Sequence, residues 1–237
     1  MPDEEKEPEI RLETAKIPAE ELELPSSNKW FIISLIAVVG IFILIIAGIR
    51  AFDSLTGEVI TIDELHKKNL DGDLKQDQGY TYNGYSFVFT DGLWWTQAVI
   101  NNRKVNPGMH FGPKELENIT VSGKLTNASF EKPELYISID PIQSDKYTAL
   151  AVSELSNSLI SLTQKPMTAA CSFNETTACI DRPIINCQNK DKAVIQLIPE
   201  SFPKVELEDN CVKIFGQDME LVKAAERFLY RFYGIMI

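Results

Sequence analysis

Residues 30–49 read WFIISLIAVVGIFILIIAGI, an unbroken apolar run with one hydroxyl group, on Ser34, and no charged side chain. An α-helix rises 1.5 Å per residue, so a run of this length spans about 30 Å, the thickness of the hydrocarbon core of a bilayer. A buried helix of a soluble protein would show a polar stripe, and this run shows none. The sequence therefore predicts a membrane-spanning helix over Trp30–Ile49 in contact with the lipid bilayer, with Trp30 and Arg50 at the two interfaces.

The segment before this helix, residues 1–29, holds nine acidic and four basic residues and has no apolar periodicity. It is predicted to be an acidic, disordered tail. A cleaved secretory signal would have a short basic leader and a shorter apolar core, so an uncleaved signal anchor fits better. Lys16 and Lys29 precede the helix and Arg50 follows it, which weakly favours a cytoplasmic N-terminus.

Residues 50–79 are predicted to form a polar connector that contains one short helix. Thr61 and Glu64 match a capping box at the start of this helix, and Gly72 is suited to its end.

From residue 80 the sequence alternates aromatic residues with small or polar ones, in YTYNGYSFVFTDGLWWT. Asn83-Gly84 and Asp91-Gly92 interrupt this alternation, which is the pattern of β-hairpin turns. An antiparallel sheet is therefore expected to begin here.

Two amphipathic helices are expected further along the chain. Apolar residues recur at intervals of three and four within 145–162, where Asp145 is suited to the N-cap, and again within 218–234. Strands are predicted at 119–125, 135–140, 193–198 and 204–216, with the last two paired through the turn PESFP. Residues 80–237 are thus predicted to be an α+β domain with the helices packed on a mainly antiparallel sheet.

All four cysteines follow the apolar run, at Cys171, Cys179, Cys187 and Cys211. Structural zinc sites and redox sites usually pair cysteines two to four residues apart, and these spacings are longer. An even number of cysteines beyond a membrane helix is typical of disulfides in an oxidising compartment. We therefore predict two disulfides and prefer Cys171–Cys179 with Cys187–Cys211, because the first closes a short loop and the second fits the expected hairpin.

Three glycosylation sequons also follow the helix, at Asn118, Asn127 and Asn174. With the cysteines, these candidate glycosylation sites favour a cytoplasmic N-terminus and an extracytoplasmic, cell-surface C-terminal domain in the cell membrane.

The composition argues against several kinds of chemistry. A net charge of −11 disfavours a nucleic-acid partner, because a polyanion would be repelled. Phosphate-binding, dinucleotide-binding and metalloprotease motifs are absent from the sequence. His110 is interpreted as a structural or surface histidine, so no catalytic, cofactor-binding or metal-ligating residue is singled out. In a strand, Trp94 and Trp95 would point to opposite faces, so one would enter the core and the other would face outward, where it caps a groove or meets a partner. The alternative is that both serve only as packing.

Five stretches, taken in order, resemble a family of single-pass membrane proteins of small-genome (DPANN-type) archaea. They are YTYNGYSFVFTDGLWWTQ, MHFGPKELENITVSG, LAVSELS, the AAC…C…C block and the closing NCVKIFG…ERFLYRFYGIM. The resemblance covers about residues 80–237 and implies an envelope protein, with no catalytic residue to carry over.

The leading hypothesis is a membrane-anchored surface or envelope protein whose exported domain binds or scaffolds a protein or envelope partner. A pilin-like filament subunit is one alternative, although Ser34 stands where type IV pilins typically carry a glutamate. A membrane-tethered hydrolase with a carboxylate site is the other.

Overall fold

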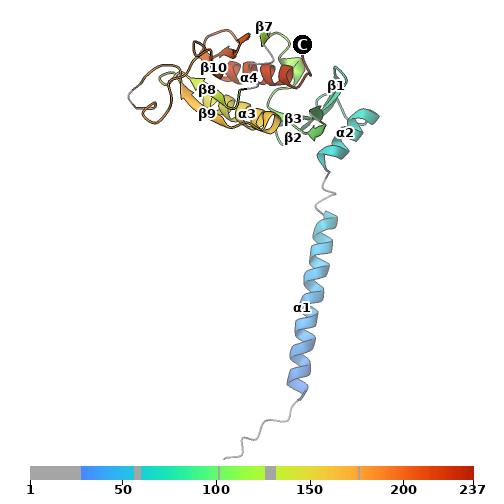
Figure 1. Cartoon of the computed structure of the whole chain (residues 1–237). Helices are drawn as coiled ribbons and strands as arrows, with labels where there is room; N and C mark the ends of the chain where they lie inside the picture. Colours follow the sequence, from blue (N-terminus) through green and yellow to red (C-terminus); the bar gives the residue numbers. More distant parts are fainter. Residues whose placement is uncertain (1–27, 56–59, 101, 126–131, 176) are drawn as a thin grey trace, which may run out of the picture. The chain divides into compact units, whose positions relative to one another are not determined.

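The computed structural model describes residues 28–55, 60–100, 102–125, 132–175 and 177–237, in two compact units that divide between Val59 and Ile60. The sequence-predicted acidic tail and the sequon at Asn127 lie outside the described residues. The fold is α+β, with one apolar helix in the first unit (Figure 1).

The first unit contains the helix α1, Asn28–Leu55. Its apolar stretch Trp30–Arg50 is long enough and apolar enough to cross a membrane, and none of it is buried inside the molecule. Fifteen of its large apolar side chains are between 50% and 77% exposed. The helix therefore has no packing partner of its own among the described residues.

The second unit begins with α2, Ile62–Asp71. Thr61 and Glu64 form the predicted capping box, and Gly72 ends the helix at a φ of 83°. The amide of Asn69 anchors α2 to the sheet behind it by donating to the carbonyl oxygens of Tyr80 and Phe87. The globular part thus starts at Ile60, and α2 belongs to it and not to the connector that the sequence indicated.

A small antiparallel sheet follows, and the predicted hairpins form its first three strands. Asn83-Gly84 and Asp91-Gly92 take positive φ angles at the two tight turns, as such hairpins require. The strand order is β1 (Gly79–Tyr82), β2 (Tyr85–Thr90), β3 (Leu93–Thr96) and β6 (Gly108–Met109), and a separate pair is formed by β4 (Ala98–Ile100) and β5 (Arg103–Val105). A 3-10 turn, Pro113–Glu115, leads on to the main sheet.

The main sheet has six strands, and it is not mainly antiparallel as predicted. Its order is β7 (Thr120–Leu125), β11 (Lys204–Asp209), β12 (Cys211–Gly216), β10 (Ala193–Pro199), β8 (Leu135–Ile139) and β9 (Met167–Cys171). Only β11 and β12 pair antiparallel, and the other neighbours are parallel. The reason is that α3, Lys146–Thr163, connects β8 to β9 as a crossover, and a crossover helix makes the two strands parallel.

The predicted pairing of β10 with β11 through PESFP is also wrong. A tight turn at Asp209 and Asn210 folds β11 directly onto β12, and β12 then inserts between β11 and β10. The four residues between β10 and β11, 200–203, span the width of the inserted strand, since strands lie about 4.8 Å apart.

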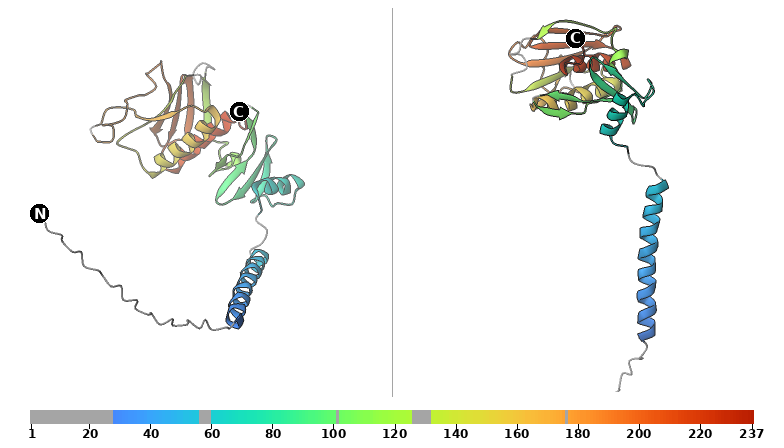
Figure 2. Two further views of the ribbon diagram at one scale, coloured as in Figure 1. Left: turned by 60° about the horizontal axis from the view of Figure 1, so that its bottom comes forward. Right: turned by 90° about the vertical axis from the view of Figure 1, so that its right-hand side faces the viewer.

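The helices α3 and α4 (Met219–Phe232) lie side by side and cover one face of this sheet (Figure 2). Both amphipathic helices fall where the sequence placed them, and Asp145 caps α3 by accepting from the N–H of Thr148. The main core lies between these helices and the inner strand residues, among them Ile195 and Ile214, which are fully buried.

Candidate functional site

Three side chains that could bind a metal ion converge at the helical side of the domain: His110, Glu154 and Glu226, here called the His110 cluster. His110 follows β6, Glu154 lies on α3 and Glu226 lies on α4. The imidazole Nδ1 contacts a carboxylate oxygen of Glu154 and lies 3.6 Å from Oε1 of Glu226. One donor atom from each residue lies within 4.8 Å of the other two.

Helix α4 fixes the backbone on which His110 stands. Glu226 is fully buried, and its two carboxylate oxygens accept from the backbone N–H groups of His110 and Phe111, at 2.6 and 2.9 Å. One turn later, the hydroxyl of Tyr230 donates to the carbonyl oxygen of Phe111 at 2.8 Å. The loop after β6 is therefore held to α4 by two backbone N–H groups, which donate to Glu226, and by one carbonyl oxygen, which accepts from Tyr230.

The pKa values of both carboxyl groups in the cluster are raised. Burial, together with the neighbouring Glu154 carboxylate, raises the pKa of Glu226 to about 9. Burial also raises the pKa of Glu154, which His110 partly opposes. Oε2 of Glu154 is buried and has no hydrogen-bond partner among the residues that the structure describes. The cluster thus brings two largely buried carboxyl groups and a half-exposed imidazole together.

Sequence reasoning missed Glu154 and Glu226 and interpreted His110 as a structural or surface residue without a partner. A signal was present, because both glutamates fall on the apolar stripes of their helices. Glu154 stands four residues after Leu150, and Glu226 stands four after Val222 and three before Leu229. A carboxylate on an apolar stripe is buried when the helix packs, which is what the structure shows for Glu226.

The cysteines lie on the other side of the main sheet and at its end. The structure joins Cys171 to Cys179 and Cys187 to Cys211, with Cα–Cα distances of 6.1 and 5.4 Å. The second bond ties the segment around Ile185 across the sheet face that the helices leave free. A small second core is buried beneath this segment, formed by Tyr136, Ala170, Ile185, Cys187, Val194 and Cys211.

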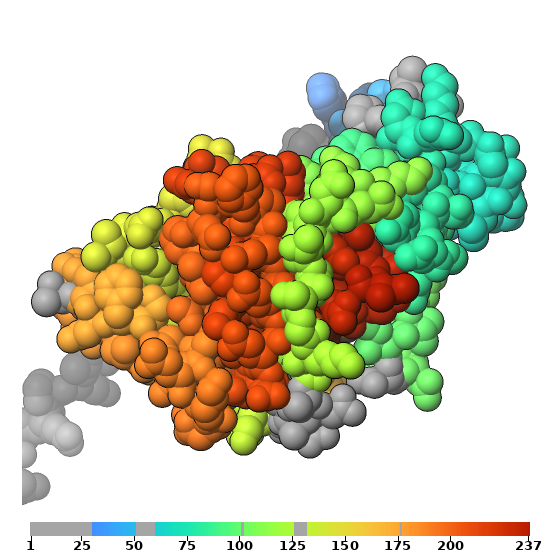
Figure 3. Space-filling model, turned by 90° about the horizontal axis from the view of Figure 1, so that it is seen from above, coloured from blue at the N-terminus to red at the C-terminus, as the bar shows by residue number. Residues whose placement is uncertain are grey.

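The rest of this face, here called the outer sheet face, is open (Figure 3). In that view β7 lies beside the strands of residues 193–216, and no helix passes in front of them. A shallow cleft of about 560 Å³ runs between the disulfide-bonded segment and β12. Its lining mixes charged, amide and apolar groups, including Lys190, Gln196, Ile198, Lys213 and Phe215.

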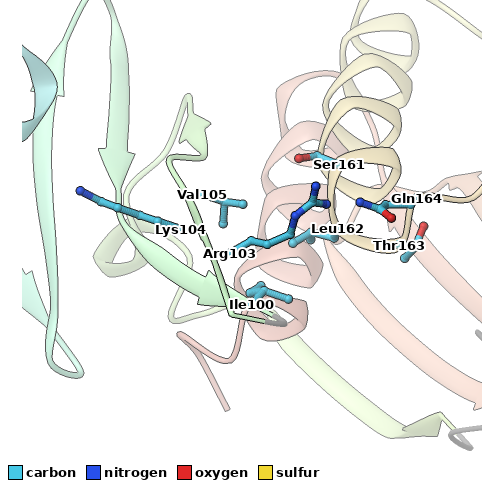
Figure 4. Close-up of a pocket in the computed structure, with 8 residues that line it drawn as sticks. All are labelled: Ile100, Arg103, Lys104, Val105, Ser161, Leu162, Thr163 and Gln164. Carbon is cyan, nitrogen blue, oxygen red and sulfur yellow. The ribbon is translucent and has the colours of Figure 1, made fainter.

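A second groove, of about 640 Å³, lies between the β4–β5 pair and the last turn of α3 (Figure 4). Arg103 reaches across it toward Ser161 and Gln164, whereas Lys104 points away and pairs with Asp63 at 2.9 Å. A cation beside the C-terminal carbonyls of a helix offsets the negative end of the helix dipole, so Arg103 has a structural explanation.

Trp94 and Trp95 are both half-buried. The ring of Trp94 packs against Tyr80 and Phe89, with centroid distances of 4.8 and 5.1 Å. The indole N–H of Trp95 donates to the carbonyl oxygen of Thr90. These contacts explain both rings as packing, so a partner contact by either one stays a prediction.

The sequons at Asn118 and Asn174 lie at exposed positions. Exposure is compatible with glycosylation at both, which also stays a prediction.

No protein-family model, no curated protein and no solved structure matches this chain.

Proposed function

We propose that this protein is a single-pass membrane protein whose disulfide-bonded domain stands on the extracytoplasmic side and binds a partner there. The observation that carries the proposal is the unpartnered apolar helix α1 joined to a domain that holds all four cysteines. The N-terminus is then cytoplasmic, and the domain of residues 60–237 is displayed at the cell surface or in the envelope.

The energetics of α1 support the membrane assignment. Burying a fully exposed large apolar side chain contributes about 1.5–3 kcal/mol, and the fifteen side chains are half to three-quarters exposed, so together they represent on the order of 15–25 kcal/mol. That is at least as large as the whole folding stability of a typical domain, about 5–15 kcal/mol. Such a surface needs an apolar surrounding, and the 21 residues of Trp30–Arg50 match a bilayer in length.

The cysteines support the side of the membrane. Disulfides persist in oxidising compartments and are rare where glutathione and thioredoxin keep thiols reduced. All four cysteines of the chain are paired in the structure, and all lie after α1. An extracytoplasmic domain explains both facts together.

Trapping the thiols in living cells tests this part of the proposal. Cells are treated with a membrane-permeant alkylating reagent before lysis, and the intact mass of the purified chain is measured without reduction. We expect no alkyl adduct on the cysteines and a mass lower by four hydrogen atoms. Four alkylated cysteines would place the domain in a reducing compartment and reject the proposal.

Partner binding is assigned to the outer sheet face, because no helix covers it and the Cys187–Cys211 bond supplies a fixed wall beside its cleft. A photo-crosslinking amino acid at Gln196, on the floor of the cleft, should yield a discrete cross-linked species in intact cells. The matched control at Ser153, exposed on α3, should not. Equal cross-linking from both positions, or none from Gln196, would argue against this face.

A further inference from the structure

The His110 cluster joins three ligand-type side chains that are far apart in the sequence and come from three different elements. The two carboxylates approach from the adjacent helices α3 and α4, and the imidazole approaches from the loop that α4 holds in place. Neither the membrane anchor nor the outer sheet face explains this convergence, because the cluster lies on the helical side of the sheet.

The cluster is incomplete as a set of protein contacts alone. Glu226 is completely buried, the side chain of Glu154 is only 11% exposed, and Oε2 of Glu154 lacks a partner among the described residues. Burying two carboxylates side by side is costly unless a proton or a cation lies between them. His110 supplies at most one positive charge, and its own side chain is 39% exposed.

We propose that His110, Glu154 and Glu226 form a binding site for a divalent first-row transition-metal ion, of which Zn²⁺ fits best. Ligands at about 2.0–2.2 Å from a tetrahedral zinc ion lie about 3.3–3.6 Å from one another. The 3.6 Å between Nδ1 of His110 and Oε1 of Glu226 agrees with this spacing. For an ion to bind, the closer contact between His110 and Glu154 has to open by rotation of one of the two side chains.

The donor set decides the class of ion. Imidazole and carboxylate donors without a thiolate suit zinc and its first-row neighbours, whereas Ca²⁺ and Mg²⁺ prefer oxygen donors alone. Three protein ligands leave the fourth position to water, the arrangement of open zinc sites. His110 is partly exposed, so the cluster borders solvent on the side of the imidazole.

The groups around the ligands are arranged as outer-shell partners of a metal site. The backbone N–H groups of His110 and Phe111 orient the carboxylate of Glu226, and Tyr230 of the same helix binds the carbonyl oxygen of Phe111. Partners of this kind set the direction of the ligand atoms before the ion arrives.

The test uses the purified full-length chain in detergent, freed of metal by a chelator. Zn²⁺ is added in competition with a chromophoric chelator, and the bound metal is counted by mass spectrometry after desalting. We expect one ion per chain, a rise in the unfolding temperature, and, with Co²⁺ in place of Zn²⁺, the intense visible d–d absorption of a tetrahedral site.

Two ligand variants and one control decide the outcome. H110A and E154Q should each weaken zinc binding by at least about tenfold, because loss of an outer-shell partner alone already costs 10–100-fold. The control E220Q removes a carboxylate that pairs with Lys223 on the same helix and should bind like the original chain. Near-ultraviolet circular dichroism checks that each variant is folded, and E154Q, which keeps the shape of the side chain, decides the matter if H110A does not fold.

The proposal is overturned if the metal-free chain takes up no stoichiometric Zn²⁺, or if folded E154Q or H110A binds it as tightly as E220Q does. If no Zn²⁺ is taken up, the three side chains share a proton and only hold the loop after β6 to the helices α3 and α4. Because all of these measurements use purified protein, their outcome is independent of which side of the membrane the domain occupies.

Discussion

The two disulfides should contribute unequally to stability, and the structure gives the size of the difference. Cys187 and Cys211 are 24 residues apart, whereas Cys171 and Cys179 are 8 apart. In the chain-entropy account a cross-link stabilises by restricting the unfolded chain, and the effect grows with the logarithm of the closed loop. This gives about 3.5 kcal/mol for the longer loop and about 2.6 kcal/mol for the shorter one.

Packing should widen this difference. Cys187 and Cys211 are both buried in the small core beneath the segment at Ile185, together with Val194. Without the bond, this segment can leave the sheet and expose that core to water. The loop that holds Cys179, by contrast, contributes none of its described residues to either core, although Cys179 itself is only 5% exposed.

The comparison is between the double variants C187A/C211A and C171A/C179A, with alanine chosen to avoid burying a hydroxyl group. Guanidinium unfolding of the full-length chain in one detergent, followed by tryptophan fluorescence, gives the free energies. The original chain unfolded with a reducing agent is the control. We expect C187A/C211A to lose roughly 1 kcal/mol more than C171A/C179A. Equal losses, or a larger loss in C171A/C179A, would refute the loop-and-core reasoning.

Three further outcomes follow from individual contacts. D145A should lose about 1 kcal/mol by removing the N-cap of α3, whereas D145N should keep most of the cap. The N–H of Thr148 donates to Asp145 and lowers the pKa of its carboxyl group. In the original chain the contribution of the cap to stability is therefore complete above pH 3.8 and is lost as the pH falls below that value. If the unfolding free energy of D145N shows the same acid dependence, this reasoning is contradicted. N69A should cost about 1–3 kcal/mol, because it removes the hydrogen bonds by which Asn69 fastens α2 to the carbonyl oxygens of Tyr80 and Phe87, and a loss within error would mean that α2 is not part of the domain core. L155A should cost about 2–5 kcal/mol by opening a cavity between α3 and the sheet, since Leu155 is fully buried, and calorimetry showing an unchanged melting temperature would exclude that packing.

Local patterns in the sequence predicted local structure well. The turns at Asn83-Gly84 and Asp91-Gly92, the capping box at Thr61 and the cap at Asp145 each act within a few residues. Their chemistry is complete within the segment itself, so tertiary packing does not override it.

Strand pairing was harder, because it depends on contacts between distant segments. The strand β9, MTAAC, is short and carries no alternation that marks it, so the crossover β8–α3–β9 was not recognised. Without that crossover the main sheet looked antiparallel. The structure confirms the predicted bond between Cys187 and Cys211, but the reasoning that led to the prediction was wrong. Cys211 is the first residue of β12 and lies beside Val194, because β12 pairs in parallel with β10. It does not lie at the end of a β10–β11 hairpin.

The His110 cluster could not be assembled from sequence for the same reason. Its members are separated by 44 and 72 residues, counted from His110 to Glu154 and from Glu154 to Glu226. Only the packing of α3 against α4 and of both against the loop after β6 brings them together. What the sequence did contain was a carboxylate on the apolar stripe of each helix, which marks such positions for attention in similar chains.

The central claim is that α1 crosses a membrane and displays residues 60–237 outside the cytoplasm. The most direct measurement is labelling of intact cells with a membrane-impermeant amine reagent, followed by peptide mapping of the purified chain. We predict labels on exposed lysines of the domain, such as Lys146 and Lys190, and none on the lysines of residues 1–29 until the cells are permeabilised. Labels confined to the N-terminal lysines, or a chain recovered in the soluble fraction, would contradict the account.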